Sequence, residues 1–183
     1  MKNTKILFSA DQIDSRVKML ANDIRNDWAE KEMTVIALLK GGLIFLADLI
    51  RHLERSLVFD VMGVKSYSGK TESCGEVQLL QDITADIKGK QVLLVDDILD
   101  TGLTLSWVQQ HLLEKGADNV KTCVLLDKPA RRVIAITPDY CGFCIENKFV
   151  VGYGMDYDDK YRNLGCIAVL KDPDKDMDLH KFK

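Results

Sequence analysis

The chain has 183 residues, of which 46% are hydrophobic, and its formal net charge is −3. This length is enough for one sizeable buried core, so a single domain over residues 1–183 is expected. The nearly balanced charge, with no run of Lys and Arg, argues against nucleic acid as a partner.

The amino-terminal residues and the cysteines indicate the cellular compartment. The first nine residues have too short an apolar piece for a signal peptide, and no stretch is long enough to cross a membrane. Five cysteines, an odd number in a chain without an export signal, indicate reduced thiols. We therefore expect a soluble cytoplasmic protein that has no membrane partner.

Hydrophobic periodicity alternates between helix and strand along most of the chain. Ser9–Gln12 has the form of a capping box, and apolar residues at helical spacing continue to Trp28. The charged face of this helix, which includes Arg16, is expected to be solvated. Strands are expected over residues 33–39, 57–65, 76–80, 92–95, 120–126 and 166–170, and further helices over 43–53 and through Leu105, Val108 and Leu112. The alternation predicts an α/β domain with a mostly parallel central sheet flanked by helices and a smaller β-rich lobe over the site.

The stretch from Val92 to Thr104 carries the strongest functional signal. Its apolar strand residues run into three carboxylates, Asp96, Asp97 and Asp100, and then into a hydroxyl-rich turn where a helix begins. Because α/β sheets bind ligands beyond the carboxyl ends of their strands, function is expected just after Val95.

The turn and the acids beside it suit different parts of a ligand. Backbone N–H groups and hydroxyls at a helix start suit a phosphate, whereas three acids would repel one unless the ligand also brings hydroxyls or a divalent cation. A sugar phosphate that carries Mg²⁺ satisfies both requirements. The alternative is an ordinary helix start, in which Asp complements the helix dipole and Thr caps the first turn. One acid would fit that alternative, but three acids at a strand end favour function.

A turn of Lys40, Gly41 and Gly42 joins the strand at 33–39 to its helix. Glycines let backbone N–H groups approach an anion closely, and Lys40 adds a positive charge. An ordinary strand-to-helix turn explains the same residues equally well.

Residues 66–75 form a polar segment between two predicted strands, with two glycines and no apolar periodicity. A mobile loop is expected there. A plain hairpin loop is one interpretation, and a lid that closes over a site and keeps water out is the other. Residues 172–183 form a charged tail with no assigned task.

Two patterns later in the chain match metal or cofactor motifs poorly. Cys141 and Cys144 have CxxC spacing, but there is no second pair and no nearby set of His residues, so a four-ligand metal site lacks members. Gly152 and Gly154 lack the third glycine and the following helix of a dinucleotide loop. Neither pattern predicts a site.

The stretch from Val92 to Thr104 resembles the thirteen-residue phosphoribosyl diphosphate (PRPP) signature of type I phosphoribosyltransferases. The shared pattern is an apolar strand, two acids, two apolar residues, Asp-Thr-Gly and then Thr. Other segments between about Val35 and Leu170 resemble the hypoxanthine-guanine branch of that family. The resemblance implies the family fold with a small β-rich hood lobe, Mg²⁺ as cofactor, and a homodimer or homotetramer. It implies purine salvage, in which the 5-phosphoribosyl group passes from PRPP to a 6-oxopurine to give IMP or GMP and diphosphate.

The resemblance also assigns roles at the donor site. PRPP and its phosphates are bound by Lys40, Gly41, Asp96, Asp97, Asp100, Thr101, Gly102, Leu103, Thr104 and Arg162. Mg²⁺ is held, directly or through water, by Asp96, Asp97 and Asp156. Asp100 is either the general base that takes a proton from the purine ring nitrogen or a carboxylate that stabilises the developing ribosyl cation. The resemblance also implies a strained or cis peptide between Leu39 and Lys40. Asp158 and Asp159, which follow Asp156 closely in the sequence, are expected to be solvated.

At the acceptor site, the resemblance assigns Lys128, Phe149 and Val150 to the purine. Lys128 donates to the exocyclic oxygen, which selects a 6-oxopurine over adenine. Phe149 stacks on the base, with a core position as the alternative for this residue, and the Val150 backbone reaches the base edge. Ser66 and Tyr67 belong to the closing loop.

Two other functions remain open at this point. Another type I transferase would act on xanthine, orotate or another pyrimidine, and a competition assay between bases separates these enzymes. A PRPP-sensing regulator that binds nucleic acid would need a basic face or an added DNA-binding module, and the sequence offers neither.

Overall fold

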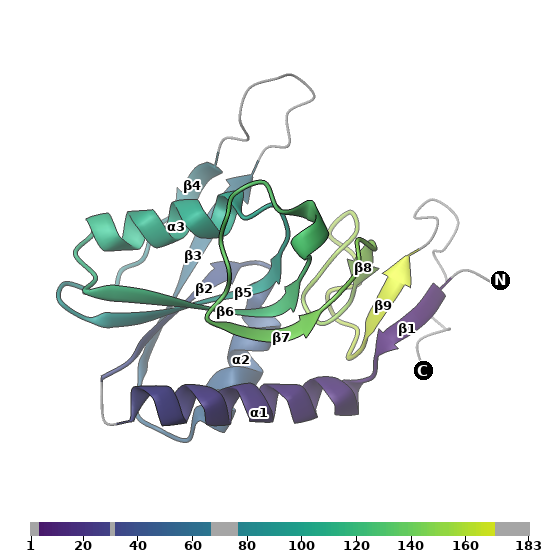
Figure 1. Cartoon of the computed structure of the whole chain (residues 1–183), viewed down its shortest axis with the longest axis horizontal. Helices are drawn as coiled ribbons and strands as arrows, with labels where there is room; N and C mark the ends of the chain where they lie inside the picture. The colour runs from purple at the N-terminus through teal and green to yellow at the C-terminus, as the bar shows by residue number, and fades with distance from the viewer. Residues whose placement is uncertain (1–3, 30–31, 67–76, 171–183) are drawn as a thin grey trace.

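A six-stranded sheet forms the centre of the structure, a computed structural model that describes residues 4–29, 32–66 and 77–170 (Figure 1). Its strand order is β4-β3-β2-β5-β6-β7, and all neighbours are parallel except β3 and β4. The strands are β2 (Thr34–Leu39), β3 (Val58–Ser66), β4 (Val77–Gln81), β5 (Gln91–Leu99), β6 (Asn119–Asp127) and β7 (Tyr140–Cys144). The expected α/β fold with a mostly parallel sheet is confirmed.

Helices cover both faces of this sheet. In Figure 1, α1 (Ala10–Trp28) and α2 (Gly42–Leu53) lie below it, and α3 (Leu103–Glu114) lies above it. Strand β2 shows why its sequence is apolar throughout: Val35 and Ala37 belong to the core on the α1 and α2 side, whereas Ile36 and Leu38 belong to the core on the α3 side. A strand covered on both faces needs apolar side chains at every position.

The start of α1 follows the predicted capping box. The Gln12 backbone N–H donates to Ser9 Oγ at 3.3 Å, and the Ser9 N–H donates to Gln12 Oε1 at 2.9 Å. One expectation for this helix is wrong, because Arg16 is not simply solvated. Its guanidinium donates to the carbonyl oxygens of Cys141 and Gly142 in β7, at 2.7 and 2.6 Å. These contacts join residues more than a hundred positions apart, and helix periodicity carries no information about them.

A three-stranded antiparallel sheet forms a hood beside the carboxyl ends of the central strands (Figure 1). Its order is β1-β9-β8, and its strands are β1 (Thr4–Phe8), β8 (Val150–Val151) and β9 (Ile167–Leu170). The hood lobe is therefore confirmed, but β1 was not predicted. Its hydrogen-bonding partner β9 lies at the other end of the chain, and strand formation depends strongly on such partners.

Strand β5 continues beyond the predicted end at Val95. Pairing with β6 extends through Ile98 and Leu99, so Asp96 and Asp97 lie within the strand rather than in a loop. The neighbouring strand supplies hydrogen-bond partners that keep the polar residues extended. The acids are consequently held by the sheet itself.

Some expectations fall outside the described residues. Tyr67 and most of the predicted 66–75 loop belong to this group, as does the 172–183 tail, while Ser66 is the exposed last residue of β3. None of the described helices is both long and apolar enough to cross a membrane.

Candidate active site

Four segments meet at the carboxyl end of the central sheet. They are the turn after β2, the end of β5 with its following loop, the segment after β6, and the hood segment around β8. A cavity of about 210 Å³ lies between the last three and is lined by Asp97, Ile98, Asp100, Lys128, Arg131, Phe149, Val150, Met155 and Asp156. Residues predicted for donor and acceptor thus share one cavity.

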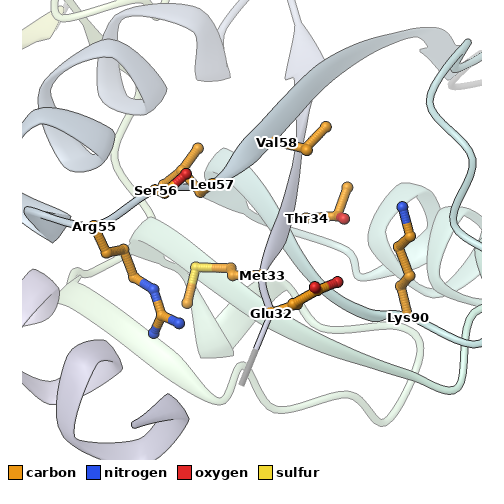
Figure 2. Close-up of a pocket in the computed structure, with 8 residues that line it drawn as sticks. All are labelled: Glu32, Met33, Thr34, Arg55, Ser56, Leu57, Val58 and Lys90. Atoms are coloured by element: carbon orange, nitrogen blue, oxygen red, sulfur yellow. The ribbon is translucent and has the colours of Figure 1, made fainter. Parts of the chain in front are cut away.

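A larger cavity of about 400 Å³ lies at the opposite edge of the sheet. Figure 2 shows it beside the first residues of β2 and β3, and it is lined by Glu32, Met33, Thr34, Arg55, Ser56, Leu57, Val58 and Lys90. None of the predicted site residues lies there. Because α/β proteins bind ligands at the carboxyl ends of their strands, the smaller cavity is the better candidate.

Two adjacent carboxylates, Asp96 and Asp97, lie near the end of β5, and Asp97 lines the cavity whereas Asp96 does not. Burial raises the pKa of Asp96 well above its usual value, and the neighbouring charge of Asp97 raises it further. Burial also raises the pKa of Asp97, although the Arg162 guanidinium opposes this shift. The pair is therefore costly to ionise fully until a positive charge comes close.

The turn after β2 packs against Asp97 so closely that it has no room for a side chain. A Cβ at Gly41 would lie 1.9 Å from Asp97 Oδ2, and a Cβ at Gly154 would lie 2.1 Å from the Gly41 carbonyl oxygen. The peptide between Leu39 and Lys40 is cis, as the family resemblance implied. Glycine at 41 and 154 thus lets the end of β5, the start of α2 and the hood come into contact.

The loop after β5 leads directly into α3. Gly102 has a φ of 88°, and the helix begins at Leu103, so backbone N–H groups are available at its first turn. The Thr101 carbonyl accepts from the N–H groups of Val133 and Ile134, at 2.8 and 3.0 Å. This arrangement suits an anion at the helix start, as predicted for residues 100–104.

Lys128, Asp100 and Arg131 all line the cavity. Lys128 is only 6% exposed, and burial lowers its pKa, while the charge of Asp100 partly restores it. Arg131 Nε lies 3.0 Å from Asp100 Oδ1. The site therefore holds a buried cationic donor next to a carboxylate, which is suited to a polar ligand with an exposed oxygen.

Phe149 lies at the cavity wall rather than in the core. Its side chain is 47% exposed, and its ring meets that of Tyr157 edge to face at 5.8 Å between centroids. Val150, by contrast, is buried in β8, which pairs with β9. An exposed ring over a cavity is free to stack on a flat ligand, so the core alternative for Phe149 is wrong.

Arg162 connects the hood turn to the acids around it. Its Nη2 lies 2.7 Å from Asp156 Oδ1 and 3.3 Å from Asp159 Oδ1. Asp159 Oδ1 also lies 3.1 Å from Lys40 Nζ, and its pKa is lowered, chiefly by the hydrogen bond from Lys40. Asp159 is exposed, as expected of a solvated acid, and the fold also brings two cations to it. Asp158 forms an ion pair with Lys160.

Sequence reasoning missed several residues of this site. Arg131 and Met155 line the cavity, and Arg132 holds the loop after β5 by donating to the carbonyls of Leu99 and Asp100, at 3.1 and 2.5 Å. Two adjacent arginines, separated by one alanine from the lysine and proline at the strand end, were a visible signal. Met155 has no comparable signal. Ser66 was predicted for the closing loop, and it does not line the cavity.

The carboxylates of the site fit Mg²⁺ in part. Among the described residues, no three Asp, Glu, His or Cys side chains form a group that could hold a metal. Mg²⁺ is usually bound through one or two carboxylates together with substrate phosphate oxygens. Asp96 and Asp97, whose charges need an offsetting cation, suit a metal that arrives with a phosphorylated substrate. Asp156 is engaged by Arg162.

Comparison with known proteins points to one family. The phosphoribosyl transferase domain model matches residues 5–158. A hypoxanthine-guanine phosphoribosyltransferase of Lactococcus lactis is 45% identical over 91% of this chain and 91% of its own length. One of Aquifex aeolicus is 43% identical over 93% of this chain and 97% of its own length. A solved structure of the Bacillus anthracis hypoxanthine-guanine phosphoribosyltransferase covers 92% of this chain and 99% of its own, with 44% identity and a TM-score of 0.88. A solved structure of a Staphylococcus aureus hypoxanthine phosphoribosyltransferase is 40% identical to this chain, with a TM-score of 0.87. The match covers 91% of each chain.

The close packing at Gly154 can be tested against a matched glycine. Gly154 and Gly89 both have a positive φ, 101° and 68°, but only Gly154 would place a Cβ against another atom. Gly89→Ala should lower the free energy of unfolding by about 1–2 kcal/mol from backbone strain alone. Gly154→Ala should lower it by about 1–3 kcal/mol more, because the hood must shift. Urea unfolding measures both, and equal losses in the two variants would contradict the packing argument.

Proposed function

The chain belongs to the phosphoribosyl transferase family, and from that premise we propose how its site transfers the 5-phosphoribosyl group of PRPP to a 6-oxopurine. It is an enzyme of purine salvage, like the relatives of the hypoxanthine-guanine branch. One observation carries the residue assignment. Two acids of the PRPP signature, Asp97 and Asp100, line the same cavity as Lys128 and Phe149. Donor and acceptor can therefore meet there.

PRPP is bound along the carboxyl end of β5. Asp96 and Asp97 engage the ribose hydroxyls and, directly or through water, Mg²⁺. When bound, Mg²⁺ neutralises the charge that develops on the departing diphosphate. The 5′-phosphate lies on the loop from Asp100 to Thr104, where the start of α3 supplies N–H donors.

The diphosphate is bound between the turn after β2 and the hood. Lys40 and Gly41 approach it from one side, and Arg162 approaches it from the other. The support for this assignment is that Lys40 and Arg162 already share an anionic partner, Asp159. In the proposed complex Asp156 contributes to a metal site, although its carboxylate lies 2.7 Å from Arg162.

The purine lies between Phe149 and the end of β5. Its face stacks on the Phe149 ring, its edge reaches the Val150 backbone, and Lys128 donates to its exocyclic oxygen. The bond from ribose carbon one to diphosphate breaks as a bond to a purine ring nitrogen forms. Asp100 takes the proton from that nitrogen or stabilises the positive charge on the ribose.

We also expect a dimer or tetramer, as in the family. Phe59 pairs in register with Val35, which belongs to the core on the α2 side, so Phe59 points to that face. Leu80 lies on the same face, next to Gly63, and both apolar side chains are more than half exposed. An uncovered apolar patch of this kind suits a second copy of the chain.

A cytoplasmic location is part of the same proposal. Cys123, Cys141, Cys144 and Cys166 are all free thiols in the described part of the chain. Free thiols are typical of a reducing compartment.

The central experiment is a conversion assay with four bases. Purified protein with PRPP and Mg²⁺ should convert hypoxanthine or guanine, in preference to xanthine and orotate. A metal chelator should abolish turnover, and added Mg²⁺ should restore it. The proposal is abandoned if neither hypoxanthine nor guanine is converted, and conversion of orotate alone would favour a pyrimidine enzyme.

The role of Asp100 predicts a large loss of rate in Asp100→Asn. A general base contributes about two to four orders of magnitude, so kcat should fall by that amount while PRPP still binds. Asp82→Asn is the matched control, because Asp82 is similarly exposed and is paired with Lys115, the residue that follows α3, outside the cavity. Turnover of the Asp100 variant near that of the control would remove the assignment.

If Lys128 binds the purine, its replacement should lower the efficiency with which the purine is used and leave the binding of PRPP unchanged. Lys128→Met should lower kcat/KM for hypoxanthine by about 10- to 100-fold, since it removes a charged hydrogen-bond donor, and should weaken the preference over adenine. Lys90→Met at the opposite edge of the sheet is the control. If the Lys128 variant changes only the KM for PRPP, the assignment to the purine is wrong.

A further inference from the structure

Tyr153 joins the hood to helix α2 beside the site. Its side chain is 6% exposed, and its hydroxyl donates to Asp48 Oδ2 at 2.5 Å. Burial raises the pKa of Tyr153, and the Asp48 carboxylate raises it further, so the hydroxyl stays protonated and remains a donor. Hydrogen bonds to a carboxylate are stronger than neutral ones. The contact is therefore a firm link between two elements that are far apart in sequence.

The turn that carries Tyr153 is tied to Arg162 by its backbone. The Gly154 N–H donates to the Arg162 carbonyl at 3.0 Å, and Arg162 Nη1 donates to the Gly154 carbonyl at 2.7 Å. The Tyr153 N–H donates to the Leu164 carbonyl at 2.8 Å. Asp156, two residues beyond Gly154, is also paired with Arg162. These contacts hold the residues of the hood turn to one another.

The same turn touches the start of α2 at a second point. Gly154 lies against the Gly41 carbonyl, and α2 begins at Gly42, the next residue. Asp48 lies on α2 about one and a half turns further along. Because α2 is rigid between these points, the bond from Tyr153 to Asp48 fixes how the hood turn sits on the turn after β2.

We propose that Tyr153 is a positioning residue for PRPP, which holds the hood turn at 152–156 against the turn at 40–42 through its hydrogen bond to Asp48. The inference rests on the proposed function, because it concerns the two segments assigned to diphosphate. The Tyr153 hydroxyl donates to Asp48 on α2 and not to a ligand. Its effect on PRPP binding is therefore carried by Arg162 and by the turn at 40–42. Lys128 and Asp100 follow β6 and β5 instead, and do not depend on this contact.

The test is Tyr153→Phe, which removes one oxygen atom. The Kd for PRPP with Mg²⁺, measured by titration calorimetry, should rise about tenfold, which is close to the lower limit for a hydrogen bond to a charged group. The KM for hypoxanthine at saturating PRPP should change less than about twofold. A general loss of structure would affect both substrates, so the split between them reports positioning.

A matched control exists at the other end of the sheet. Tyr140 is 7% exposed, and its hydroxyl donates to Asp27 Oδ2 at 2.8 Å, at the first residue of β7. The Tyr140 hydroxyl also accepts from Trp28 Nε1 and Lys121 Nζ, at 3.1 and 3.3 Å, so Tyr140→Phe should lower thermal stability by at least as much as Tyr153→Phe. It should leave the Kd for PRPP at the wild-type value.

Asp48 supplies the conservative rescue. Asn at position 48 retains an oxygen that accepts from the Tyr153 hydroxyl, whereas Ala does not. The Kd for PRPP should therefore rise less in Asp48→Asn than in Asp48→Ala. Tyr153→Phe combined with Asp48→Ala should bind PRPP no more weakly than the weaker single variant, since both remove the same bond.

Three outcomes would overturn the inference. The first is a Kd for PRPP in Tyr153→Phe within twofold of wild type, and the second is an equal loss for hypoxanthine. Either one removes the positioning role and leaves the transferase activity of the unmodified chain intact. The third is an unmodified chain that has no PRPP-dependent turnover, in which case the proposed function fails and this inference fails with it.

Discussion

The close approach of three segments at Gly41 is the constraint on which the site depends. Asp97 lies on one side of this residue and Gly154 on the other, and no Cβ fits between them. The sheet, the start of α2 and the hood can therefore meet within a few ångströms. A side chain at either glycine would push the hood away from β5, and the cavity lies between these two parts.

Charge is distributed around this packing in a consistent way. Asp96 and Asp97 are half-buried acids whose raised pKa shows that their charged forms are disfavoured without a nearby cation, while Lys40 and Arg162 lie toward the hood and share Asp159. A ligand that combines an anionic diphosphate, ribose hydroxyls and a divalent metal meets both requirements. Acids beside an anion site, which look contradictory in the sequence, thus fit one ligand with several parts.

The success of sequence reasoning depended on the range of each interaction. The capping box at Ser9 and the buried stripe of α1 were predicted because their partners lie within a few residues. Strand β1 and the contacts of Arg16 were missed because their partners lie more than a hundred residues away. The end of β5 was misplaced for a related reason, since pairing with β6 keeps polar residues in the strand.

By itself, the sequence determined the donor signature and most of the helices and central strands, because these are written in local patterns and spacings. Only the tertiary structure decided that Phe149 faces a cavity, that Asp159 joins Lys40 to Arg162, and that Tyr153 holds the hood to α2. These features depend on which distant segments pack together. That choice is made by the whole sheet and its two cores, and no local pattern records it.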